Sequence, residues 1–133
     1  MRNHEDLEVW QKAHALTIKL YRATEVFPRA EMFGLTSQIR RAASSIGANL
    51  AEGCGRWSEA EMARFVQIAM GSASELHNHL RLAHDLGFLN PAQCSSASKD
   101  LISIRQMLTA FLQSLRGVRS PRQTATASLA KSE

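Results

Sequence analysis

The stretch GLTSQIRRAASSIGANLAEG, residues 34–53, decides the fold of this chain. Apolar side chains recur along it at spacings of three and four residues, which is the pattern of an amphipathic helix. This apolar stripe consists of Leu35, Ile39, Ala42, Ile46 and Leu50. Elsewhere in the stretch Ala, Ser and Gly are frequent, and small side chains let helix axes approach closely. The stretch therefore predicts a helix over about residues 33–53 that packs tightly against other helices.

A line of polar side chains follows another side of the same helix, again at spacings of three and four residues. The line consists of Gln38, Arg41, Ser45, Asn49 and Glu52. One interpretation is a hydrogen-bonded network at an interface between helices or subunits, in which Arg40 or Arg41 pairs with Glu52 of a neighbour. The other is a solvated outer face. We favour the interface, because a helix that faces water more usually carries Lys and Glu than Ser and Asn.

Three more segments have helical periodicity, over about residues 6–26, 58–86 and 91–116. The first should end before Pro28, because the residue preceding a proline is disfavoured in the α region. The apolar face of the segment at 6–26 includes Val9, Ala13, Leu16 and Leu20. That of the segment at 58–86 includes Phe65, Ala69, Leu76 and Leu80, and that of the segment at 91–116 includes Leu101, Ile104, Leu108 and Phe111.

The boundary before residue 59 carries two helix-start signals. Ser58 with Glu61 three residues later is the pattern of a capping box. Trp57 and Met62 flank this pair at the spacing of a hydrophobic staple, in which the two side chains pack together. The sequence therefore predicts a well-defined helix start at this point.

Glycines and a proline mark the other boundaries. Gly53 and Gly55 are expected to end the helix over about residues 33–53 by taking positive φ. Gly87 is expected to end the helix over about residues 58–86 in the same way. Asn90 followed by Pro91 is a side-chain cap followed by proline at the first helical position. These signals separate four helices by short connections.

Short connections force consecutive helices to lie side by side and to run in opposite directions. The sequence thus predicts an all-α, antiparallel up-down-up-down four-helix bundle over residues 1–117 of the 133-residue chain. Residues 118–133 are rich in Ser, Thr and Ala and nearly free of large apolar side chains, so we expect a disordered basic tail there. Such a tail either solubilises the protein or contacts phosphates.

The formal net charge of +4 is unevenly distributed. Residues 116–133 carry four basic side chains against one acidic, whereas residues 1–115 carry 12 against 11. No apolar run approaches the roughly 20 residues that a membrane span needs. The two cysteines, Cys54 and Cys94, form no disulfide framework. We expect a cytoplasmic protein without a membrane partner.

Catalytic and metal-binding patterns are weak. His77 and His84 lie seven residues apart, whereas a metal site needs three or four converging ligands. Cys54 is placed near the C-terminal end of a helix, where the dipole disfavours a thiolate. We expect no catalytic residues, no metal site, no cofactor and no enzymatic activity.

Five stretches occur in the order of a known bacterial family: LEVWQKA at residues 7–13, FP at 27–28, GLTSQIRRAA at 34–43, NLAEG at 49–53 and IAMGS at 68–72. With them the chain resembles the four-helix-bundle proteins first noticed as products of intervening sequences within 23S ribosomal RNA genes. That family is similar to the accessory variability proteins of diversity-generating retroelements. The resemblance implies a homopentameric ring. For the retroelement relatives it also implies a basic surface that binds nucleic acid and a reverse transcriptase as partner.

Two functional hypotheses remain open. The first is an oligomeric adaptor that binds RNA or DNA through repeated basic patches, because arginine binds phosphate bidentately and an exposed tryptophan can stack on a base. Its candidate residues are Arg40, Arg41, Arg56, Trp57 and Arg64. The second is a protein-only scaffold for a partner such as a reverse transcriptase, anchored by aromatic side chains. Its candidate anchors are Trp10, Tyr21 and Phe33, beside the polar line already described.

Overall fold

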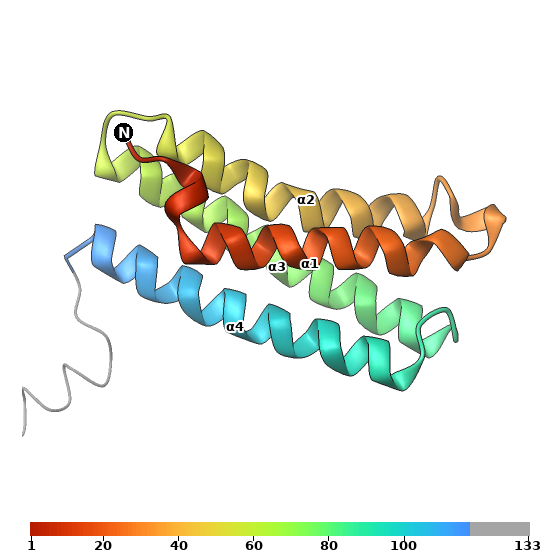
Figure 1. Cartoon of the computed structure of the whole chain (residues 1–133). Helices are drawn as coiled ribbons and strands as arrows, with labels where there is room; N and C mark the ends of the chain where they lie inside the picture. Colours follow the sequence, from red (N-terminus) through yellow and green to blue (C-terminus); the bar gives the residue numbers. More distant parts are fainter. Residues whose placement is uncertain (118–133) are drawn as a thin grey trace, which may run out of the picture.

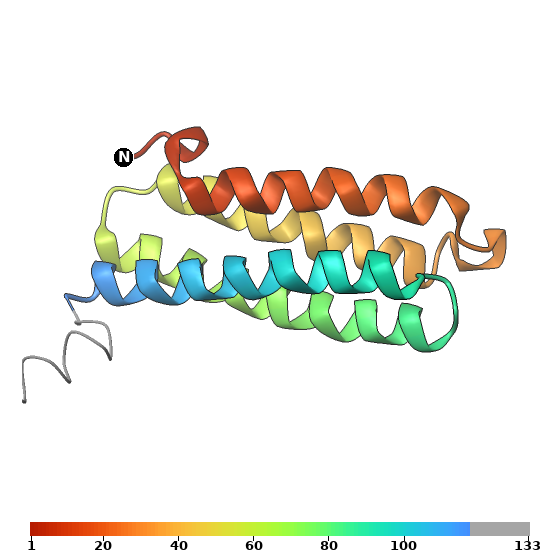
Figure 2. The same ribbon diagram turned by 60° about the horizontal axis from the view of Figure 1, so that its bottom comes forward.

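The computed structural model describes residues 1–117, and the predicted basic tail at 118–133 lies outside the described residues. The described part is all-helical, with no strand (Figures 1 and 2). Its long helices are α1 (Glu8–Ala23), α2 (Leu35–Cys54), α3 (Glu59–Asp85) and α4 (Pro91–Leu115). Three short 3-10 turns accompany them: η1 (His4–Asp6), η2 (Thr24–Val26) and η3 (Arg29–Glu31).

The four long helices form a bundle in which α1 and α3 each contact both α2 and α4 (Figures 1 and 2). Polar contacts fix the register between them. Thr17 Oγ1 of α1 donates to the Ala43 carbonyl of α2 at 3.1 Å. Lys19 of α1 forms an ion pair with Asp100 of α4 at 2.7 Å. The core lies between the four helices.

Most of the apolar stripes predicted from the sequence are buried in this core, whereas Phe65 of α3 and Phe111 of α4 are only half-buried. All five stripe residues of α2 are at most 7% exposed, and Ile39, Ile46 and Leu50 are fully buried. Burial of apolar surface stabilises the fold by roughly 25 cal/mol per Å². The fully buried large side chains of the other helices are Leu16, Leu20, Met62, Val66, Leu76, Leu80, Leu101, Ile104 and Leu108.

The ends of α1 differ from the predicted range of 6–26. The helix begins at Glu8, because His4–Asp6 form a separate 3-10 turn that the Asn3 side chain caps. It ends at Ala23, and the chain tightens into η2 before Phe27 takes an extended conformation. That conformation is the one that Pro28 imposes on its predecessor.

The helix α2 ends just before Gly55, as predicted, but the positive φ predicted for Gly53 and Gly55 is wrong. Gly53 lies inside the helix, and Gly55, the first residue after the helix, has φ −81°. A Cβ atom at Gly53 would lie 2.9 Å from Met62 Sδ and 2.9 Å from Phe65 Cβ, so this glycine serves a close approach of α2 and α3. Gly87 does take positive φ, at 79°, just after α3.

The start of α3 also differs from its prediction. The Ser58 side chain accepts a hydrogen bond from the Glu61 backbone N–H at 3.1 Å, which is one half of a capping box. A complete box forms instead at the start of α4, where Asn90 and Gln93 bond each other in both directions. The predicted staple is absent, because Met62 turns into the core while Trp57 remains 87% exposed.

Candidate functional site

An open groove of about 570 Å³ runs between α1 and α2. Trp10 and Tyr21 of α1 line it, and Gly47 and Ala48 of α2 lie opposite them. A Cβ atom at Gly47 would lie 3.3 Å from Trp10 Nε1, so the mid-helix glycine makes room for the indole. The sequence indicated that the small residues of this helix serve close contacts, but not that Trp10 is the partner of Gly47.

Two histidines hold the Trp10 ring in place. The His14 ring stacks on it, with centroids 4.7 Å apart and an interplanar angle of 12°. The His4 ring meets it edge-on, with centroids 5.0 Å apart. The predicted anchors Trp10 and Tyr21 therefore lie in one groove, with the first fixed by aromatic contacts.

The polar line of α2 divides between two environments. Ser45 Oγ lies 2.8 Å from Ser72 Oγ of α3, and the Asn49 side chain donates to the Ser45 carbonyl at 2.8 Å. Gln38 and Glu52 are exposed, and Glu52 pairs with Arg56 of the same chain at 2.6 Å. Of the five residues of the line, Ser45 and Asn49 therefore lie at the contact with α3, and the other three face solvent.

Arg40 and Arg41 also differ in their environments, because Arg40 contacts the end of α1 whereas Arg41 faces solvent. Arg40 Nε donates to Thr24 Oγ1 at 2.9 Å and its Nη2 donates to the Tyr21 carbonyl at 3.1 Å. Its guanidinium also lies 4.7 Å from the centroid of the Tyr21 ring. Arg40 thus holds the C-terminal end of α1, where a cation is favoured by the helix dipole. Arg41 is exposed.

The other three nucleic-acid candidates lie at the corner between α2 and α3. Trp57 is 87% exposed, and the Arg56 guanidinium lies 5.2 Å from the centroid of the Phe65 ring. Arg64 is exposed on the first turns of α3. Arg41 lies 13 residues before the end of α2 at Cys54, about 20 Å at 1.5 Å per helical residue, so the five candidates form two groups. Exposed Glu59 and Glu61 make the corner mixed in charge.

The connection between α1 and α2 carries an exposed apolar tip, of which the sequence had singled out Phe33 as a candidate anchor but not Val26 or Met32. We define the tip as Val26, Met32 and Phe33, whose exposed fractions are 81%, 51% and 92%. Phe27 in the same connection is buried and packs against Phe88, with ring centroids 5.5 Å apart. The sequence contained the signal, two apolar pairs flanking Pro28, but not which member of each pair turns outward.

Reactive groups are sparse in residues 1–117. No three His, Cys, Asp or Glu side chains in this range converge as metal ligands. Burial raises the pKa of the Cys54 thiol, while Arg2 and the N-terminal ammonium act in the opposite direction. None of the helices described is both long and apolar enough to cross a membrane.

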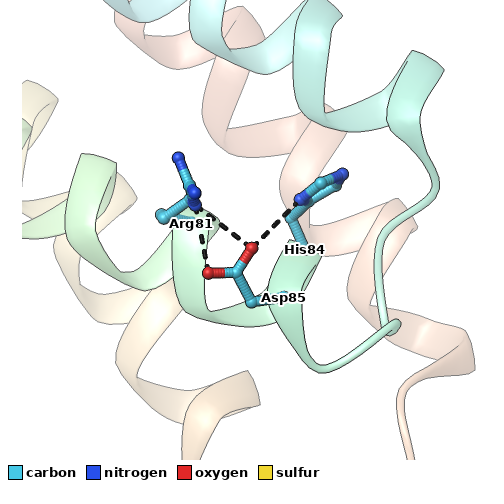
Figure 3. Close-up of polar contacts among 3 residues, drawn as sticks. All are labelled: Arg81, His84 and Asp85. Carbon is cyan, nitrogen blue, oxygen red and sulfur yellow. Dashed lines mark hydrogen bonds and ion pairs between the residues drawn. The ribbon is translucent and has the colours of Figure 1, made fainter.

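One local charge cluster lies at the end of α3, where Arg81, His84 and Asp85 meet (Figure 3). Arg81 Nε donates to both Asp85 carboxylate oxygens, at 3.1 and 3.0 Å, and His84 Nδ1 lies 3.4 Å from Oδ1. The hydrogen bond from Arg81 lowers the pKa of Asp85 below its ordinary value of 3.8, and the His84 contact acts in the same direction.

Arg81→Ala should return the pKa of Asp85 towards its ordinary value, because it removes the largest cause of the lowering. A depressed carboxyl pKa favours the folded state above the unfolded pKa, and the effect is lost as pH falls through the folded pKa. NMR titration of the Asp85 carboxyl measures the change, with Lys99→Ala as a control. An Asp85 titration that is unchanged in Arg81→Ala would contradict the assigned cause.

Comparisons with known proteins identify both a family and a fold. A family described as 23S rRNA-intervening sequence protein matches residues 5–110. A crystal structure of a protein of unknown function from the S23 ribosomal protein family of Bacteroides thetaiotaomicron is similar, with a TM-score of 0.73. The two chains are 24% identical over 79% of this chain and 95% of that chain, a likeness that shows the fold. No curated protein matches the sequence.

Proposed function

Because the chain belongs to the 23S rRNA-intervening sequence protein family, we propose that it is a non-enzymatic adaptor that assembles into a homo-oligomer and binds nucleic acid. The subunit would be an antiparallel up-down-up-down bundle, the assembly a pentameric ring, and the site of action the cytoplasm. The observation that carries the nucleic-acid part is the exposure of Trp57, which follows Arg56 in the sequence and precedes the exposed Arg64 by seven residues.

The order of contacts along the helices supports the antiparallel arrangement. From Thr17 to Tyr21 along α1, the partner in α2 moves back from Ala43 to Arg40. Between α2 and α3, Ser45 meets Ser72, whereas Gly53 lies against Met62. Residue numbers that rise in one helix and fall in its neighbour are expected when the helices run in opposite directions.

Exposed aromatic surface supports the binding of unpaired bases at the α2–α3 corner. A tryptophan that is 87% exposed leaves its π-face available for stacking, which is worth about 1–3 kcal/mol per base. Arg64 could bind a neighbouring phosphate bidentately. The acidic neighbours Glu59 and Glu61 limit the strength of each site, but a ring repeats the site and avidity multiplies weak contacts.

We expect the full chain to bind single-stranded RNA with an affinity that falls steeply as salt rises, because phosphate contacts release counterions. Trp57→Ala should weaken binding about five- to hundredfold, the effect of losing one stacked base. Fluorescence anisotropy with a labelled RNA and a matched DNA at two salt concentrations measures both effects.

Matched variants separate stacking from charge. Trp57→Phe keeps an aromatic face and should retain much of the affinity, Arg64→Ala should reduce the salt slope, and Lys99→Ala on α4 should change neither. Binding that is lost only when the chain is shortened to end at Gly117 would assign it to the tail. Binding absent from both lengths of chain would exclude nucleic acid as the ligand.

The alternative function is a protein-only scaffold, and the groove between α1 and α2 favours it. Trp10 and Tyr21 line this groove beside small α2 residues, a surface suited to an apolar partner. A partner such as a reverse transcriptase would bind there with little dependence on salt, and Trp10→Ala would abolish the interaction. Gel filtration of the complex at two salt concentrations distinguishes this function from nucleic-acid binding.

A further inference from the structure

A small cavity of about 250 Å³ lies where the end of α1, the connection after it and the first turns of α2 meet. Pockets for drug-sized ligands usually measure about 300–1,000 Å³, so this volume favours a smaller ligand. Polar groups make up most of the lining, beside the apolar side chains of the connection. The polar lining residues are Thr24, Glu25, Arg29, Thr36 and Arg40.

The Thr36 hydroxyl is the group in this lining that lacks a partner. Thr36 is only 7% exposed, yet its Oγ1 makes no hydrogen bond with any of residues 1–117. In that part of the chain every fully buried side-chain oxygen or nitrogen has a partner, so the Thr36 oxygen must reach open space, and the space that Thr36 lines is the cavity. Hydroxyls this deep in a fold are normally hydrogen-bonded, so a bound polar group is expected beside it.

Two arginines bring unused donors to the same cavity. Arg40 spends Nε on Thr24 and Nη2 on the Tyr21 carbonyl, which leaves its Nη1 without a partner among residues 1–117. The Arg29 side chain is exposed and forms no hydrogen bond or ion pair within the same range. Guanidinium groups make short, charge-assisted hydrogen bonds to phosphate oxygens. Two of them beside a free hydroxyl therefore suit a tetrahedral oxyanion.

The start of α2 adds backbone donors and a favourable dipole. No side chain caps this helix, and its first turn holds no acidic residue. The N–H groups at residues 35–37 have no acceptor in the part of the chain that the structure describes. Free N–H groups and the dipole at a helix N-terminus favour anions. Two carboxylates oppose them, since Glu25 lines the cavity and a Cβ atom at Gly34 would lie 3.0 Å from Glu31 Oε2.

We propose that this cavity binds a phosphate group, with Arg29 and Arg40 donating to its oxygens and the Thr36 hydroxyl orienting it. The group is either free phosphate or the terminal phosphate of a larger molecule, because both present the same tetrahedral oxyanion. The cavity lies at the start of α2, whereas Trp57 follows the end of that helix (Figure 1). The site is therefore separate from the proposed nucleic-acid surface, and the two are tested by different variants.

NMR titration of the full chain with sodium phosphate tests the site, with phosphate replacing chloride at constant ionic strength. Saturable shifts are expected at the Arg29 and Arg40 side-chain N–H groups and at the Thr36 amide. Arg29→Ala should weaken binding about tenfold and Thr36→Val about fivefold, the loss of a charged and of a neutral hydrogen bond. Glu25→Gln should tighten binding, because it removes a like charge from the lining.

Matched controls separate a built site from general attraction of anions. Lys99→Ala removes one positive charge outside the cavity and should leave the affinity unchanged. Thr36→Ser keeps the hydroxyl and should bind like the wild type, and circular dichroism melts verify that each variant folds. Shifts that never saturate, equal weakening by Lys99→Ala, or wild-type affinity in both Arg29→Ala and Thr36→Val would overturn the proposal.

Two further pairs of ligands identify the source of the phosphate. Adenosine monophosphate should bind and adenosine should not, and equal binding of the two would overturn the proposal. Oligonucleotides of one sequence with a 5′-phosphate or a 5′-hydroxyl then distinguish the two sources. Shifts in the cavity that only the phosphorylated strand produces would identify a strand end as the ligand, and shifts by phosphate and the monophosphate alone would identify a free anion.

Discussion

Leu50→Ala should lower the free energy of unfolding by about 2–5 kcal/mol, the largest effect that we expect from a single substitution in this chain. Leu50 lies on α2 with 0% exposure and belongs to the core cluster shared by the four helices. Truncation removes buried methyl groups and leaves a cavity that surrounding helices fill only in part. Urea unfolding followed by circular dichroism measures the change.

Leu82→Ala is the matched control, because it makes the same chemical change at a side chain that is 46% exposed on α3. It should cost about 1 kcal/mol or less, since less apolar area is lost. Both variants must be compared at one protein concentration, because the proposed assembly would add to apparent stability. Equal costs for the two variants would contradict the placement of Leu50 in the core.

The helices could be predicted from the sequence because their apolar spacing depends on local geometry alone. A stripe such as Ile39, Ile46 and Leu50 has one helical interpretation, whichever neighbours cover it. The helix ends were less predictable. Trp57 and Met62 stand at staple spacing, yet the path of the α2–α3 connection leaves Trp57 in solvent and turns Met62 into the core.

The candidate surfaces could be predicted only in part, because they depend on the register between helices. Ser45 and Asn49 were placed on a polar line, but the Ser72 hydroxyl that meets Ser45 comes from a position 27 residues later. Arg40 was assigned to ligand binding, whereas its contacts with Thr24 and Tyr21 arise from the way α2 packs against the end of α1.

Glu52 shows the same limitation. The sequence predicted that it pairs with Arg40 or Arg41 of a neighbour at an interface. In the structure its side chain is 54% exposed and pairs with Arg56 four residues later. Spacing on a helix tells which side chains share a face, but whether that face is covered depends on the rest of the fold and on assembly.

Gly53→Ala should lower the free energy of unfolding by about 1–3 kcal/mol, the cost of overpacking a tight contact. The added methyl group would lie 2.9 Å from Met62 Sδ and from Phe65 Cβ. The Met62 side chain is flexible, but Phe65 Cβ is tied to the α3 backbone, so the helices themselves must separate. This cost outweighs the gain of about 1 kcal/mol that alanine offers over glycine inside a helix.

Gly71→Ala isolates that helix-propensity gain. Gly71 lies within α3, and its added Cβ would meet nothing within 4 Å. The substitution should therefore raise the free energy of unfolding by about 0.4–1 kcal/mol. If Gly53→Ala lowers the free energy of unfolding while Gly71→Ala raises it, then contact with α3, and not backbone conformation, requires glycine at position 53. Two stabilising changes would mean that α2 and α3 do not approach closely at this corner, the same corner that presents Trp57.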